Sequence, residues 1–127
     1  MSAIVSKSLP RDHFEPEPAL SPDEQRRLRA HLERIDYAGF AANVKVIRET
    51  LGSANIERFE QLATATARAR AQWVAATLSL VGQGGAMAAE DVQRLVTMRA
   101  AYEELSEAYE AMRRMVERGY LAFQTKA

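Results

Sequence analysis

The sequence predicts an all-α protein, a helical bundle made of two short N-terminal helices and a long antiparallel αα-hairpin. Three observations lead to this fold class. Apolar residues in the last third recur at alternating spacings of three and four, the middle third is rich in alanine, and a glycine cluster separates these two parts. We expect helices at about 22–35, 40–51, 54–81 and 88–123.

The C-terminal helix is the element around which the other helices are organised. Its apolar residues form one narrow seam, which only Gly119 interrupts. At ~1.5 Å rise per residue this helix would be about 50 Å long, so it needs a partner helix from this chain or from another. We therefore take the seam, with Tyr120 added, as a candidate interface. Its residues are Leu95, Met98, Tyr102, Leu105, Tyr109, Met112, Val116, Tyr120 and Phe123.

The N-terminal segment differs in composition from the remainder of the chain. Residues 1–20 contain three prolines, which remove backbone donors and fix φ, so we expect an extended or disordered tail there. Residues 21–127 would then form a single helical domain. A second reading of the tail is a docking arm, in which Leu9 and Phe14 bind a partner or a neighbouring subunit.

The two short helices are predicted from their end signals. Ser21 can cap a helix that begins at Pro22, and Glu24 stands where a capping box places its acid. The stretch from Asp36 to Gly39 indicates a break between the first and second helices. Gly52 is a good stop for the second helix, and Ser53 is a candidate cap for the third.

The third helix and the fourth are expected to form a hairpin. Alanines alternate with polar residues between Ala63 and Ala71, but alanine is a poor strand former and the best helix former, so we predict helix. The segment 82–85 holds three glycines, which end a helix and leave a short loop. A pivot at Gly84 places Phe59 opposite Tyr109, and Trp73 opposite Leu95.

The composition excludes several functional classes. The chain has no cysteine, which removes disulfides, thiolate catalysis and cysteine-based zinc sites. Seventeen basic residues balance seventeen acidic ones, so nothing draws the whole chain to nucleic acid or anionic lipid. No apolar run is long enough to span a membrane, and the N-terminus does not have the pattern of a signal peptide. We expect a cytoplasmic protein, and the excess of arginine over lysine indicates a bacterial source.

No motif in the sequence points to catalysis. The two histidines, His13 and His31, do not belong to a metal-ligand pattern, and the run of glutamates from Glu103 to Glu110 should form a solvated face. The glycine cluster has no Lys-Ser/Thr after it, so it is not a phosphate loop. We therefore predict no enzyme activity, no cofactor and no metal. One alternative remains open for His31, a histidine phosphotransfer module, because Arg27 and Arg34 flank it at helical spacing.

The sequence leaves two further alternatives open. A helix over 40–51, a turn and a second helix carrying Arg68 and Arg70 would make a helix-turn-helix DNA-binding regulator dimerised by the C-terminal helix. The alanine-rich third helix, together with Met98, Met112 and Met115, could instead bind an apolar surface such as a lipid body or a client helix.

The prediction that we prefer is a non-catalytic protein that acts through protein–protein contacts as an oligomeric adaptor, scaffold or regulator. Its partners would be itself and another protein, with no membrane span, and nucleic acid is not expected.

Overall fold

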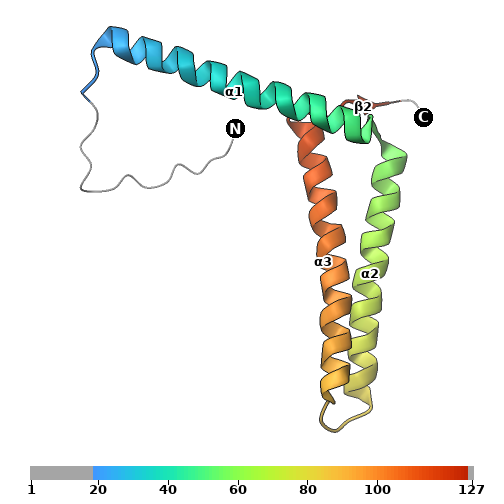
Figure 1. Ribbon diagram of the computed structural model, residues 1–127. Coiled ribbons are helices and arrows are strands. Elements are labelled where there is room, and N and C mark those ends of the chain that lie inside the picture. The colour runs from blue at the N-terminus through green and yellow to red at the C-terminus, as the bar shows by residue number, and fades with distance from the viewer. Residues whose placement is uncertain (1–18, 126–127) are drawn as a thin grey trace. The chain divides into compact units, whose positions relative to one another are not determined.

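The computed structural model describes residues 19–125, and this part of the chain is mostly helical, as the sequence predicts (Figure 1). It divides into two compact units whose boundary lies between Val46 and Ile47. The elements are α1 (Pro22–Leu51), β1 (Ala54–Asn55), α2 (Ile56–Gly82), α3 (Ala89–Glu117) and β2 (Phe123–Gln124).

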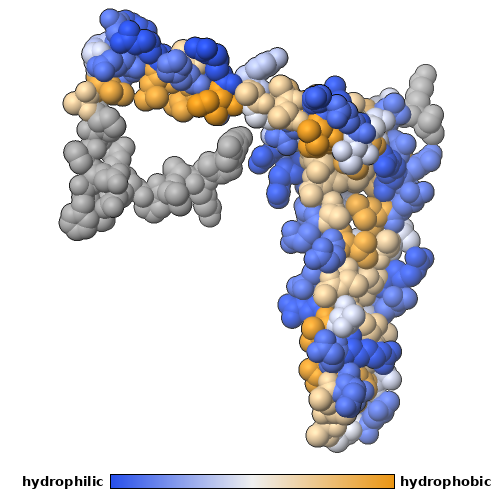
Figure 2. Space-filling model, viewed as in Figure 1, coloured by the Kyte–Doolittle hydropathy of each residue, from blue (hydrophilic) through white to orange (hydrophobic). Residues whose placement is uncertain are grey.

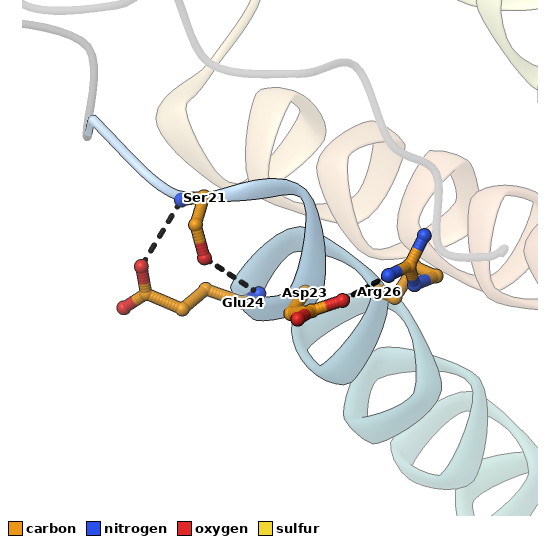
Figure 3. Close-up of polar contacts among 4 residues, drawn as sticks. All are labelled: Ser21, Asp23, Glu24 and Arg26. Carbon is orange, nitrogen blue, oxygen red and sulfur yellow. Dashed lines mark hydrogen bonds and ion pairs between the residues drawn. The ribbon is translucent and has the colours of Figure 1, made fainter.

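Helix α1 begins with the capping box that the sequence predicts (Figure 3). The Glu24 N–H donates to Ser21 Oγ at 3.1 Å, and the Ser21 N–H donates to Glu24 Oε1 at 3.0 Å. Asp23 and Arg26 form an ion pair one turn apart. The hydrogen bond from the Ser21 backbone, and then that with its side chain, lowers the pKa of the exposed Glu24 carboxyl below its ordinary value.

The predicted break between two short helices is wrong, because α1 continues without interruption from Pro22 to Leu51. Gly39 lies inside the helix, where it costs about 1 kcal/mol relative to alanine. The neighbouring Ala38 and Ala41 are strong helix formers and no proline lies between residues 23 and 51, so this cost is too small to end the helix. The Asn43 side chain donates to the Gly39 carbonyl at 2.9 Å within the helix.

The connection between α1 and α2 is short and held by specific bonds. Gly52 ends α1 as predicted, with φ of 76° and an N–H that donates to the Arg48 carbonyl at 2.9 Å. The cap of α2 is Asn55, whose Oδ1 accepts from the Arg58 N–H at 2.9 Å, so the predicted cap at Ser53 is wrong. Arg58 Nη1 donates at 2.7 Å to the carbonyls of Leu51 and Ser53.

Helices α2 and α3 lie side by side and are joined by the short glycine-containing loop that the sequence predicts (Figure 1). Gly84 and Gly85 have φ of 75° and 76°, the left-handed conformation that glycine adopts without strain. The two helices of the hairpin therefore run in opposite directions, and Phe59 contacts Tyr109 as expected.

Helix α3 ends at Glu117, six residues before the predicted end at 123. Gly119, with φ of 78°, terminates it in a Schellman motif. The Gly119 N–H donates to the Val116 carbonyl at 3.0 Å, and the Tyr120 N–H to the Met115 carbonyl at 2.9 Å. Tyr120 and Phe123 therefore do not continue the helical seam.

The open end of the hairpin is closed by two strands that the all-helical prediction did not include. β1 and β2 pair in parallel, with Ala54 opposite Phe123 and Asn55 opposite Gln124. The Ala54 N–H donates to the Ala122 carbonyl at 2.8 Å. Ala54 and Leu121, exposed by 0% and 2%, are the only buried residues among residues 19–125.

Candidate interaction surface

The predicted seam of α3 is half-buried along its whole length. From Leu95 to Val116, each of its seven residues is half-buried, and none is buried. Tyr120, beyond the end of the helix, is also half-buried, whereas Phe123 is 42% exposed. Helix α2 thus covers the seam only in part and leaves some of each seam side chain accessible.

Helix α2 presents a matching series to α3. Its half-buried residues include a run at spacings of three and four, which places them on one face. Three of the seven are alanine or threonine, so large side chains of α3 can lie close to the α2 backbone. The run consists of Phe59, Leu62, Thr66, Ala69, Trp73, Ala76 and Leu80.

Aromatic rings join the two helices at two levels. Near the strands, Phe59 contacts Tyr109 edge to face at 5.7 Å between ring centroids and also contacts Phe123 at 6.3 Å. In the middle of the hairpin, Trp73 stacks on Tyr102 at 6.0 Å. The edge-to-face pair and the stacked pair have arrangements that aromatic rings prefer, and each adds about 0.5–1.5 kcal/mol beyond its apolar area.

Two arginines extend the central stack, and sequence reasoning did not find this role for them. The Arg70 guanidinium lies 5.7 Å from the centre of the Tyr102 ring, and that of Arg99 lies 5.7 Å from the centre of the Trp73 ring. Arg99 also pairs with Glu103 at 3.5 Å. The sequence does contain a sign of this role, because both arginines lie beside apolar positions of their helices. An arginine at such a position can lay its side chain over a neighbouring aromatic ring.

One side of the hairpin carries a shallow groove between α2 and α3, which we call the open groove. Its two parts share Tyr109, so they follow one another along the same side. The residues of α2 in its central part are small or basic, which leaves room above the aromatic rings. The open groove is lined by Ile56, Phe59, Ala63, Thr66, Ala67, Arg70, Tyr102, Ser106, Tyr109, Glu110, Arg113, Val116, Glu117 and Phe123.

The surface colouring shows the same distribution. In Figure 2 a band of apolar residues runs along the hairpin between hydrophilic flanks. Toward the loop, large apolar side chains are exposed on both helices, including Leu78 at 66%, Val81 at 62% and Val96 at 54%. An exposed apolar surface that continues along a helix pair is typical of a protein–protein contact site.

The other residues singled out in the sequence do not come together. Glu103, Glu104, Glu107 and Glu110 are exposed, as predicted for a solvated face. His31 is exposed on α1. Leu9, Phe14 and His13 lie outside the described residues.

Within residues 19–125, no group of three or more acidic or histidine side chains is placed to hold a metal ion. None of the helices in this part of the chain is long and apolar enough to cross a membrane. Comparison of the chain with protein-family models, curated proteins and solved structures finds no match. Its function therefore has to be inferred from its own residues.

Proposed function

We propose that this protein is a non-catalytic, oligomeric helical protein that acts through protein–protein contacts, as an adaptor, scaffold or regulator. The contact surface is the open groove of the hairpin. A helix from a second copy or from another protein lies in this groove. It covers the seam residues that line the groove, which are Tyr102, Tyr109, Val116 and Phe123.

The half-burial of the seam supports this proposal most directly. A pair of long helices that packs only against itself leaves part of every seam residue in water, and burial of apolar area is worth about 25 cal/mol per Å². A third or fourth helix would remove this area from water, as in helical bundles.

The chemistry of the groove agrees with a helical occupant. Ala63 and Ala67 are exposed and small, so a second backbone can approach α2 closely there. Tyr102 and Tyr109 offer apolar rings with polar tips, which are favoured at interfaces. Arg113 and Glu117 at one end offer charges of both signs to the rim of a contact.

The DNA-binding alternative has less support. It requires a short helix over 40–51 before the turn, but this segment is the last part of the 30-residue α1. Arg70 is engaged over the Tyr102 ring. Among residues 19–125, no feature favours the phosphotransfer alternative over the contact surface.

The test is the solution mass of the full chain by light scattering, with a variant that fills the groove. Ala67→Arg adds a large charged side chain at an exposed position, where it blocks a docked helix and leaves the α2–α3 contact intact. We expect the wild type to be an oligomer and Ala67→Arg to have a lower mass at unchanged helix content.

The matched control is Thr64→Arg, which adds the same charge at an exposed position of α2 outside the open groove. It should keep the wild-type mass. A wild type that is monomeric at all concentrations and captures no partner, or an Ala67→Arg variant with unchanged mass, would contradict the proposal.

A further inference from the structure

Helix α1 carries an apolar face of its own, which we call the α1 face. Its four large side chains are exposed: Leu28 by 45%, Leu32 by 48%, Ile35 by 64% and Val46 by 57%. Their spacing, completed by Gly39 and Ala42, is four and three in alternation, so all six residues lie along one side of the helix. Figure 2 shows apolar residues gathered along one side of α1.

This face is not the one that the C-terminal part of α1 buries. Val44, Ile47 and Leu51 are half-buried and lie roughly 130° around the helix from the α1 face, at 3.6 residues per turn. Helix α1 thus has two apolar faces, and the apolar spacing passes from one to the other near Gly39. The α1 face is therefore available to a partner of its own.

The order of residue sizes along this face points to one kind of partner. Large side chains occupy its first half and small ones most of its second half. If a second copy of α1 lies alongside in the opposite direction, Ile35 faces Gly39 of that copy and Leu32 faces Ala42. In the same arrangement Leu28 faces Val46. Each such pair of facing residues forms one layer of the contact, and in every layer a larger residue meets a smaller one.

We propose that α1 is a self-association site, at which two copies of this chain pack their α1 helices antiparallel through this face. The contact is two-fold symmetric about a point near Tyr37. Each of the three pairs, Leu28 with Val46, Leu32 with Ala42 and Ile35 with Gly39, therefore occurs twice. The resulting six layers cover the face from Leu28 to Val46.

The parallel arrangement fits less well, because it sets Gly39 against Gly39 and Ala42 against Ala42. These layers leave gaps beside the layers of paired leucine and isoleucine. Exposed charges decide little between the two arrangements, since pairs at a surface are weak. The antiparallel contact brings Glu24 near Lys45 twice and Asp36 beside Asp36 once, whereas the parallel one brings Glu24 near Arg29.

The contact also explains how so long a helix stays folded. An isolated helix of this length is marginal in water when it is not rich in alanine, and it gains stability by packing an apolar face. The large apolar side chains of the α1 face are exposed to water in a single chain. A second copy of α1 would cover them.

This inference deepens the proposed function, because it names a second copy as the partner at a surface other than the open groove. When a second copy also occupies the open groove, the two contacts together build an assembly larger than a dimer. Ala67→Arg tests the groove alone, and substitutions on α1 test this face alone, so the failure of one contact is distinguishable from the failure of the other.

The experiment uses disulfide formation between full-length chains, since the natural chain has no cysteine. Leu28→Cys and Val46→Cys are prepared separately, and are oxidised alone or after mixing in reductant. The antiparallel contact brings these two positions together from different copies, within reach of a disulfide. We expect a covalent dimer in the mixture, at least ten times more than in either variant alone.

A second pair, Leu32→Cys with Ala42→Cys, repeats the test one layer further in, so that loss of a single side chain does not decide the result. The control is Ala30→Cys mixed with Val46→Cys, because Ala30 lies on the opposite side of α1. Cross-linking of Leu28→Cys or Val46→Cys with itself would show a parallel contact and overturn the proposal. Absence of cross-links from both mixed pairs would overturn it as well.

Discussion

The two ends of the hairpin are built differently. At the end where β1 pairs with β2, backbone hydrogen bonds join the chain before α2 to the chain after α3, and Ala54 and Leu121 are buried. At the loop end, the connection is made by glycines, and Leu78 and Val81 are more than half exposed. Among residues 19–125, complete burial thus occurs only at the end of the hairpin where the backbone of β1 pairs with that of β2.

This comparison predicts that stability is distributed unevenly along the hairpin. Segments with buried contacts and backbone pairing open only with the whole fold, whereas exposed ends open locally. A substitution near the strand end should therefore change the free energy of unfolding more than a comparable substitution near the loop.

The largest effect is expected at Leu121, the one large side chain that is buried in the described part of the chain. Leu121→Ala should lower the free energy of unfolding by about 2–4 kcal/mol, through lost apolar burial and the cavity that remains. Denaturant unfolding of the full chain measures this. Leu121→Met, which conserves volume, should cost less than about 1.5 kcal/mol. Equal losses in both variants would show that side-chain packing is not what holds this end.

The next effect is expected in the middle of the hairpin. Trp73 is half-buried, stacks on Tyr102 and lies under the Arg99 guanidinium. Trp73→Ala should lower the free energy of unfolding by about 2 kcal/mol, less than for a buried tryptophan because part of the ring is already in water. Trp73→Phe keeps an aromatic ring there and should lose less than half as much. A Trp73→Ala variant as stable as the wild type would exclude the stack as a structural contact.

Local patterns in the sequence were enough to predict most of the helical structure. The capping box at Ser21, the stop at Gly52 and the glycine loop each depend on a few adjacent residues, and all are confirmed. The half-burial of the seven seam residues from Leu95 to Val116 agrees with the spacing of these apolar residues along the sequence.

Other features depend on contacts between distant residues or on a balance of small energies. The pairing of Ala54 with Phe123 joins segments almost 70 positions apart, and neither segment is long enough to give a strand pattern. The stretch from Asp36 to Gly39 indicates a break because glycine is a plausible turn residue, but the cost of one glycine inside a helix is too small to end α1 there. At Gly119 the end signal is present in the sequence, but the apolar spacing resumes beyond it at Phe123 and favours a longer helix than the one observed.

A smaller effect, with opposite signs at the two ends, is expected for glycine-to-alanine changes. Gly119 has φ of 78°, which strains a residue with a side chain, so Gly119→Ala should lower the free energy of unfolding by about 1 kcal/mol. Gly82 ends α2 with open space around it, and Gly82→Ala should raise the same free energy by up to about 1 kcal/mol. Thermal unfolding followed by circular dichroism measures both. The same sign in both variants would contradict the assigned helix ends.

The smallest effect is expected at the loop end. Leu78 is 66% exposed, so Leu78→Gln removes little buried area and should change the free energy of unfolding by no more than about 0.5 kcal/mol. The measurement should be made at low and at high protein concentration. A loss that appears only at high concentration would mean that another chain covers this end when the protein assembles, and would extend the contact surface beyond the open groove. A loss of more than about 1 kcal/mol at every concentration would mean that Leu78 is covered within its own chain, and the contrast between the two ends would then be wrong.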